Sequence, residues 1–339
     1  MEHDPHEPDK RVAEYAKNSE DEKFLHSLND ALKTAHIVLP PVGRQLLKLP
    51  IIYVVGTPRS GTTLMYQILC KYMQVGYINN LIARFWLRPS VGIRLSETIL
   101  GTASGDLVEL KSRYGTTAGV AGPHEFGYFW RYWLKLDDSP THHLSETALA
   151  KVDARGLKHA LENEILGSFR RPLVFKNIIC GFHAAFLTAV HPDSLFVNIT
   201  RDTLATTRSI LNARKKRFGS YNAWWSLKPA SYPFDIFPDN PAAEVVKQVF
   251  DCRREIEIEL SKPGVNAVTV TYEQLCTETE QVIERIRNKI NAASNHEIKM
   301  ANCDFPNLRI SPAAALPKKI EQRLKQSILK QRKENSSGV

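Results

Sequence analysis

An apolar pentapeptide runs directly into a glycine-bracketed turn at residues 51–63, and this stretch constrains the fold more than any other. Ile51–Val55 is a continuous apolar run, which is typical of a strand buried on both faces of a parallel sheet. Gly56 and Gly61 bracket the turn, and a helical pattern continues to Tyr72. Backbone N–H groups at such a junction converge on an anion. The sequence therefore predicts an α/β fold that binds a phosphate-like group here.

The turn has the spacing of a nucleotide-binding P-loop but lacks its lysine. Thr62 stands where a Walker loop carries lysine, and Thr63 stands where the magnesium-binding hydroxyl falls. Arg59 lies two residues before the second glycine, and its planar guanidinium can bind two oxygens of a phosphate or sulfate group. This combination favours a phosphosulfate ligand over a nucleoside triphosphate. A turn that only links strand and helix is the alternative.

A second strand–loop–helix pattern, at residues 192–209, ends its strand on a cation. Leu195–Ile199 has the composition of a short buried strand, and Arg201 follows its C-terminal end. Asp202 is expected to start a helix that carries Ser209 two turns further on. Ligands of open α/β sheets bind at the carboxyl ends of the strands, so Arg201 is expected at the ligand edge.

Together the two motifs resemble the sulfotransferases that use 3′-phosphoadenosine 5′-phosphosulfate (PAPS), in the bacterial form with Arg in the 5′-phosphosulfate loop. The resemblance extends over about residues 50–290. It implies a P-loop-like parallel β-sheet flanked by helices, with PAPS as co-substrate and 3′-phosphoadenosine 5′-phosphate (PAP) as product. It also implies that Arg201 and Ser209 bind the 3′-phosphate. The 5′-phosphosulfate is expected to bind the loop residues Arg59, Ser60, Gly61, Thr62 and Thr63.

The resemblance implies that the catalytic base lies in the segment 122–130. Glu125 is the candidate, because it follows a Gly-Pro turn and opens an aromatic helix as the family's glutamate does. His124 competes with it, since the cytosolic branch of the family uses histidine and an imidazole titrates near neutrality. A third interpretation makes Glu125 only a helix-start charge stabilised by the helix dipole.

Two further strand ends supply candidate site residues. The apolar segment Pro172–Lys176 ends in a lysine that resembles the family lysine reaching the transferring sulfuryl group, and simple solvation of a strand end is the alternative. Tyr272 follows the predicted strand Ala267–Thr271 and resembles the family residue that lies near the purine. A tyrosine there can stack on the purine or form a hydrogen bond with it. The alternative is that Tyr272 only caps the sheet. Because Arg and backbone N–H groups can stabilise a phosphate leaving group, no metal is expected.

The acceptor is less defined than the co-substrate. Aromatic residues between the two motifs can form an apolar pocket or stack on sugar rings, and Trp224 and Trp225 are further candidates for the pocket or for packing. We therefore predict an O-sulfotransferase that transfers the sulfuryl group to a carbohydrate or small-molecule hydroxyl by in-line displacement with a general base. The aromatic residues between the motifs are Phe85, Trp86, Phe126, Phe129, Trp130, Tyr132 and Trp133.

Two other classes of protein share parts of this pattern. A P-loop kinase needs Lys at position 62 and a strand-end Asp for Mg²⁺, where this chain has Lys176 and Arg201. A non-catalytic phosphoadenosine-binding protein would share every anion-binding motif. It would differ only if Glu125 and Lys176 did not face an acceptor pocket.

The composition is typical of one large α/β domain. Of 339 residues, 43% are hydrophobic and 24% charged, and strand and helix patterns alternate along the chain. Helices are predicted over 21–37, 244–260 and 278–290. We expect a flexible N-terminal segment and helix over 1–45, a sulfotransferase domain with a basic C-terminal helix over 46–333, and a tail over 334–339. That basic helix is expected to be either a solvated face or a cover over the cofactor's phosphates.

The charge and cysteine content indicate the cellular setting. A net charge of +9 favours acidic ligands, but the chain has no nucleic-acid-binding motif. The five cysteines have no metal-binding spacing and indicate reduced thiols. No apolar leader and no run of 18 apolar residues is present, so we expect a cytoplasmic protein without a membrane span, although a chain that had lost its anchor would look similar. The sequence does not predict the oligomeric state.

Overall fold

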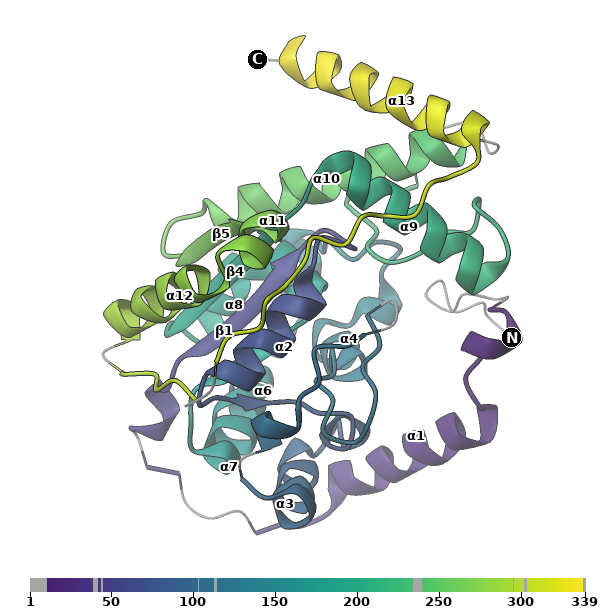
Figure 1. Ribbon diagram of the computed structural model, residues 1–339. Helices are drawn as coiled ribbons and strands as arrows, with labels where there is room; N and C mark the ends of the chain where they lie inside the picture. Colours follow the sequence, from purple (N-terminus) through teal and green to yellow (C-terminus); the bar gives the residue numbers. More distant parts are fainter. Residues whose placement is uncertain are drawn as a thin grey trace.

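A five-stranded sheet with all strands parallel lies at the centre of the computed structural model (Figure 1). The strand order is β2-β3-β1-β4-β5. The structure describes residues 11–38, 42–43, 45–102, 104–112, 115–233, 240–294, 296–301 and 304–337. The predicted α/β fold with a parallel sheet is confirmed. The strands are β1 (Ile51–Gly56), β2 (Gly76–Tyr77), β3 (Leu173–Lys176), β4 (Ser194–Thr200) and β5 (Ala267–Thr271).

Helices cover both faces of this sheet (Figure 1). One face packs on α2 and α12, and the other packs on α4, α6 and α8. The α-helices are α1 (Ser19–Thr34), α2 (Thr62–Tyr72), α3 (Pro89–Leu100), α4 (Gly127–Leu134), α5 (Glu146–Leu149), α6 (Ala154–His159), α7 (Gly167–Phe169), α8 (Ala184–Val190), α9 (Thr203–Phe218), α10 (Pro241–Leu260), α11 (Tyr272–Thr277), α12 (Thr279–Ser294) and α13 (Lys318–Ser337). A π-helix, η6 (Ala160–Leu166), joins α6 to α7, and 3-10 helices are η1 (Ala13–Tyr15), η2 (Leu46–Lys48), η3 (Ile82–Arg84), η4 (Ser104–Leu107), η5 (Leu136–Asp138) and η7 (Ile178–His183).

The central strand β1 is buried along its whole length. Ile51, Tyr53 and Val55 belong to the hydrophobic cluster on one face of the sheet, whereas Ile52 and Val54 belong to the cluster on the other. Successive side chains of a strand point to opposite faces, so a strand covered on both sides must be apolar throughout. Burial on both faces is the physical origin of the unbroken apolar run in the sequence. Because β1 ends at the edge of the sheet, the turn that follows it also lies at that edge.

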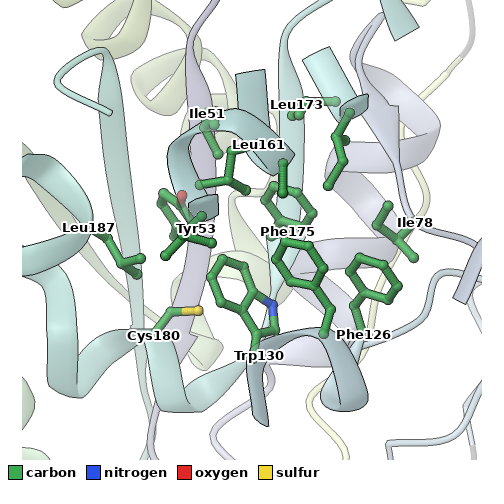
Figure 2. Packing of buried hydrophobic residues seen from close by; sticks show 14 of the residues in the cluster. Ile51, Tyr53, Ile78, Phe126, Trp130, Leu161, Leu173, Phe175, Cys180 and Leu187 are labelled. Carbon is green, nitrogen blue, oxygen red and sulfur yellow. The ribbon is translucent and has the colours of Figure 1, made fainter. Parts of the chain in front are cut away.

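The aromatic side chains of α4 fill the core beneath the sheet. Phe126, Phe129 and Trp130 are 1%, 0% and 0% exposed, and the Trp130 ring meets Phe175 edge-on at 5.6 Å between centroids. Figure 2 shows Phe126 and Trp130 packed beside Phe175 and Tyr53. The expectation that these three residues line an acceptor pocket is therefore wrong. Phe126 lies just before α4, and Phe129 and Trp130 lie on the face of α4 that turns toward β1 and β3. The sequence does not reveal which face this is, because aromatic residues occur on all sides of the segment.

The predicted helices are present, and their ends differ by a few residues. The helix expected over 21–37 spans 19–34, and Phe24 on it is 65% exposed. The basic helix α13 packs on α9 and α10 through Leu324 and Ile328, and it continues to residue 337, past the expected start of the tail. No helix among the described residues is long and apolar enough to cross a membrane.

Candidate active site

The turn between β1 and α2 is held in a conformation that depends on its glycines. At Gly56, with φ of +145°, a Cβ would lie 2.4 Å from the Ile199 carbonyl oxygen. At Gly61, with φ of +104°, a Cβ would lie 2.6 Å from the Tyr272 ring. Arg59 has φ of +65°, a region that residues other than glycine seldom adopt. Inside the turn, the Ser60 hydroxyl donates to the Thr57 carbonyl oxygen at 2.8 Å.

The two motifs that the sequence predicts to bind anions meet in space. The Arg59 Nε donates to the Ser209 Oγ at 3.0 Å, which joins the turn after β1 to α9. Arg201, at the end of β4, lies with its guanidinium 4.2 Å above the Tyr272 ring centroid. Because β1, β4 and β5 are neighbours and parallel, their carboxyl ends place these four residues at one edge of the sheet.

A segment that the sequence did not single out crosses this edge. In Figure 1 the chain between α12 and α13 passes in front of α2 and β1. The Ser311 N–H donates to the Tyr272 hydroxyl oxygen at 3.1 Å, and the Ser311 carbonyl oxygen accepts a hydrogen bond from Arg201. The Arg201 Nε is buried and has no hydrogen-bond partner among the described residues. One donor of this guanidinium is therefore available to a ligand oxygen.

The predicted catalytic residues form an ion pair. Lys176, at the carboxyl end of β3, has a side chain only 4% exposed, and its ammonium contacts the carboxylate of Glu125, whose side chain is 41% exposed. The Asn177 Nδ2 donates to the Glu125 carbonyl oxygen at 3.1 Å and so fixes the backbone at this position.

His124 lies beside this pair but has a different partner. Its Nδ1 accepts a hydrogen bond from the Phe126 backbone N–H at 2.9 Å, just before α4 begins. Burial lowers the pKa of His124, and the neighbouring Glu125 carboxylate offsets part of that effect. The ring is thus held neutral, with Nδ1 as acceptor and the proton on Nε2.

A cavity of about 1360 Å³ brings nearly all the predicted residues together. Single-ligand sites usually have volumes of about 300–1,000 Å³, so this cavity has room for two molecules. Ser60 is buried within the turn, and Ser209 is held against Arg59. The predicted residues that line the cavity are Arg59, Gly61, Thr62, Thr63, His124, Glu125, Lys176, Arg201 and Tyr272.

The rest of the cavity wall was predicted only in part. Trp224 and Trp225 line it, as one interpretation of the sequence proposed. Lys17, Arg131 and Lys228 also line the cavity but were not predicted from the sequence. They belong to three segments that are distant in the sequence and come together only when the chain folds. No three His, Cys, Asp or Glu side chains in the described part of the chain gather as metal ligands would.

The cysteines of the described part of the chain are not among the residues that line this cavity, although Cys276 contacts Tyr272, which does line it. Cys70, Cys180, Cys252 and Cys276 are buried free thiols, and Cys303 lies outside the described residues. Burial raises the pKa of the Cys70 and Cys180 thiols well above its ordinary value, which keeps them protonated and unreactive.

Comparison with known proteins identifies the family to which this α/β chain belongs. A model of the sulfotransferase family matches residues 50–293, so the chain belongs to the sulfotransferase family and is a transferase. Among solved structures, the chain is similar to sulfotransferase STF9 from Mycobacterium avium, with 15% identity, coverage of 91% of this chain and 72% of that chain, and a TM-score of 0.45. The chain is also similar to sulfotransferase STF1 from Mycobacterium tuberculosis H37Rv, with 14% identity, coverage of 82% of this chain and 77% of that chain, and a TM-score of 0.41. A search of curated proteins gave no match.

Proposed function

We propose that this protein is a PAPS-dependent O-sulfotransferase that acts on a hydroxyl of a carbohydrate or small-molecule acceptor. The observation that supports this most strongly is the shared cavity. The anion-binding turn with Arg59 and the ion pair of Glu125 with Lys176 line one space large enough for a donor and an acceptor. A protein that only bound phosphoadenosine would need the first feature and not the second.

The residues at the carboxyl edge of the sheet fit the co-substrate. Arg201 and Ser209 would hold the 3′-phosphate, since the buried Arg201 Nε lacks a partner within the described structure. Arg59 and the N–H groups at the start of α2 would hold the 5′-phosphosulfate, and Tyr272 would contact the adenine. Bound there, PAPS supplies the activated sulfuryl group.

The ion pair supplies the acid–base chemistry in this proposal. Glu125 accepts the proton of the acceptor hydroxyl at a carboxylate oxygen, as the acceptor oxygen bonds to sulfur and the bond from sulfur to the phosphate oxygen breaks. Lys176 is held by the buried end of β3, and its ammonium stabilises the negative charge that moves onto the departing phosphate. A positioned base of this kind accelerates a reaction about 10²- to 10⁴-fold.

The hydrogen-bond geometry favours Glu125 over His124 as the base. The Nδ1 of His124 already accepts from Phe126, and the remaining Nε2 carries the proton of the neutral ring. In that state His124 can donate to an acceptor oxygen but cannot take its proton. Glu125 has a half-exposed carboxylate at the cavity surface, where an acceptor can reach it.

Calorimetric titration of the purified protein with PAP, run beside ATP with magnesium, tests the proposed donor site. We expect PAP to bind and ATP with magnesium to bind far more weakly, because Thr62 replaces the P-loop lysine. Tight binding of ATP without binding of PAP would overturn the proposal and favour a kinase. Binding of PAP by a protein that transfers no sulfuryl group to any acceptor would favour the non-catalytic alternative.

A further inference from the structure

The cavity wall includes an irregular segment, residues 219–233, which connects α9 toward α10 in the sequence. We call these residues the wall segment, and several of them line the cavity, among them Trp224, Trp225 and Leu227. The wall segment contains no helix or strand, so the hydrogen-bond ladders of regular structure cannot hold it. Its conformation must therefore be fixed by other parts of the chain.

Gln248, on α10, fixes the middle of the wall segment. Its side chain is fully buried, and its Nε2 donates to the carbonyl oxygens of Trp225 and Leu227, each at 2.9 Å. Its Oε1 accepts from the Nη2 of Arg214 at 3.0 Å. Because a guanidinium can only donate, this contact determines which end of the amide faces the two carbonyl oxygens.

Arg214, on the neighbouring helix α9, is fully buried although it is charged (Figure 1). It pairs with Glu244, its Nη1 donates to the Tyr221 carbonyl oxygen at 3.4 Å, and its guanidinium lies 5.3 Å from the Trp224 ring centroid. A buried charge is costly unless it is paired and hydrogen-bonded. Two of its partners, Tyr221 and Trp224, belong to the wall segment, so the buried charge and the conformation of the wall depend on each other.

Two acids further along α10 fix the end of the wall segment. The Ser231 hydroxyl donates to the Asp251 carboxylate at 2.5 Å, and the Ala230 N–H donates to both carboxylate oxygens of Glu255 at 3.1 Å. Asp251 and Glu255 follow Gln248 at spacings of three and four residues, so the three side chains share one face of α10. No described residue of α10 lines the cavity, so this face acts on the cavity through the wall segment.

The wall segment reaches the proposed catalytic pair. Leu227 is 2% exposed and belongs to a hydrophobic cluster with Phe182, against which Ile178 packs. Ile178 follows Lys176 by two residues and lines the cavity as well. The wall segment therefore adjoins the part of the cavity that contains Lys176.

We propose that Gln248 and Arg214 are positioning residues for the acceptor, which hold the wall segment in the shape that receives an acceptor beside Glu125 and Lys176. Neither residue touches a substrate. This inference rests on the proposed function, since it assumes that PAPS fills the donor end of the cavity. A preformed wall binds an acceptor more tightly than a mobile one, because binding does not have to order it. Release of the wall therefore weakens acceptor binding and leaves the donor site unchanged.

Hydrogen–deuterium exchange of the wild type and Gln248→Glu tests whether Gln248 holds the wall. Glutamate keeps the size of the side chain and can still accept from Arg214, but it turns an oxygen, in place of the donor, toward two carbonyl oxygens. We expect the amides of residues 221–232 to exchange at least about tenfold faster in the variant, and those of residues 56–63 at the wild-type rate. The matched control is Gln326→Glu, the same substitution at an exposed position of α13.

Steady-state kinetics test whether the wall serves the acceptor. Radiolabelled PAPS is supplied with glucose, N-acetylglucosamine, octan-1-ol and 2-naphthol, and the compound that the wild type labels fastest serves as the acceptor. We expect Gln248→Glu to raise the KM for this acceptor at least about tenfold and to change kcat and the PAP affinity less than about threefold, because a wall that binds ground and transition states equally affects KM alone. A variant that was merely unstable would lose PAP affinity as well.

The outcomes separate this inference from the proposed function. Wild-type exchange of residues 221–232 in Gln248→Glu, or an unchanged acceptor KM, overturns the inference and leaves the donor site intact. Failure of the wild type to bind PAP, or to label any of the four compounds, overturns the proposed function and the inference with it. If Gln248→Glu does not fold, Ser231→Ala decides by the same comparison, because it deletes the hydrogen bond to Asp251 at a partly exposed residue.

Discussion

The side chains of Arg59 and Ser209 lie 3.0 Å apart although 150 residues separate them in the chain. The contact joins the turn after β1 to the helix after β4, and β1 pairs with β4 along the whole length of β1. A guanidinium that spans both motifs can contact the two phosphate ends of one nucleotide. This contact supports the proposal that the two sequence motifs bind one ligand.

Replacing Arg201 with alanine is expected to weaken PAP binding strongly and change stability little. The residue lies at the edge of the sheet, and a hydrogen bond to a charged ligand contributes about 1.5–3 kcal/mol, so we predict a loss of about 10- to 100-fold in affinity. Calorimetric titration with PAP measures this loss of affinity. The control is Arg254→Ala, an exposed arginine outside the cavity, which should bind PAP like the wild type. Unchanged PAP affinity in Arg201→Ala would show that the second motif was assigned wrongly.

Substitution of Gly61 by alanine tests the fit of the turn against Tyr272. The new Cβ would lie 2.6 Å from the Tyr272 ring at a φ of +104°, so the turn or the tyrosine must move. We predict a loss of about 1–3 kcal/mol in the free energy of unfolding and a weaker affinity for PAP. Gly264→Ala is the matched control, because its φ of +82° is also strained but nothing lies within 4 Å. Equal effects of the two variants on PAP affinity would count against the contact with Tyr272.

The sequence predicts the fold and the anion-binding edge better than it predicts the acceptor side. The strand of Ile51–Val55 and the strand ends at Lys176 and Arg201 are local patterns, and parallel pairing then brings their carboxyl ends together. The acceptor side depends on which face of α4 turns inward, and on Lys228, which a long-range contact with His142 positions. Neither feature leaves a periodic signal in the sequence.

The stability of the protein is expected to fall in acid because of His183. Burial lowers the pKa of this histidine to about 3, from about 6.5 in the unfolded chain. Between these values the unfolded state binds more protons than the folded state, so stability is full above about pH 6.5 and is lost as the pH falls toward 3. One such group changes the free energy of unfolding by at most about 1.4 kcal/mol per pH unit.

Urea unfolding of the wild type and His183→Gln between pH 4 and 7 measures this dependence. The glutamine can still donate to the His142 carbonyl oxygen, which His183 Nε2 contacts at 2.9 Å, but it does not titrate. We expect a flatter pH dependence in the variant. Parallel curves for the two proteins would show that other groups, such as His124, cause the loss of stability in acid.

The most direct test of the central claim is the transfer of radiolabelled sulfuryl groups from PAPS to a panel of hydroxyl acceptors by the wild type and Glu125→Gln. Glutamine keeps the size of the side chain and can still accept a hydrogen bond from Lys176, but it cannot take a proton. We predict that transfer falls about 10²- to 10⁴-fold while the affinity for PAP stays within about threefold. A Glu125→Gln variant that transfers the label at the wild-type rate would contradict the account.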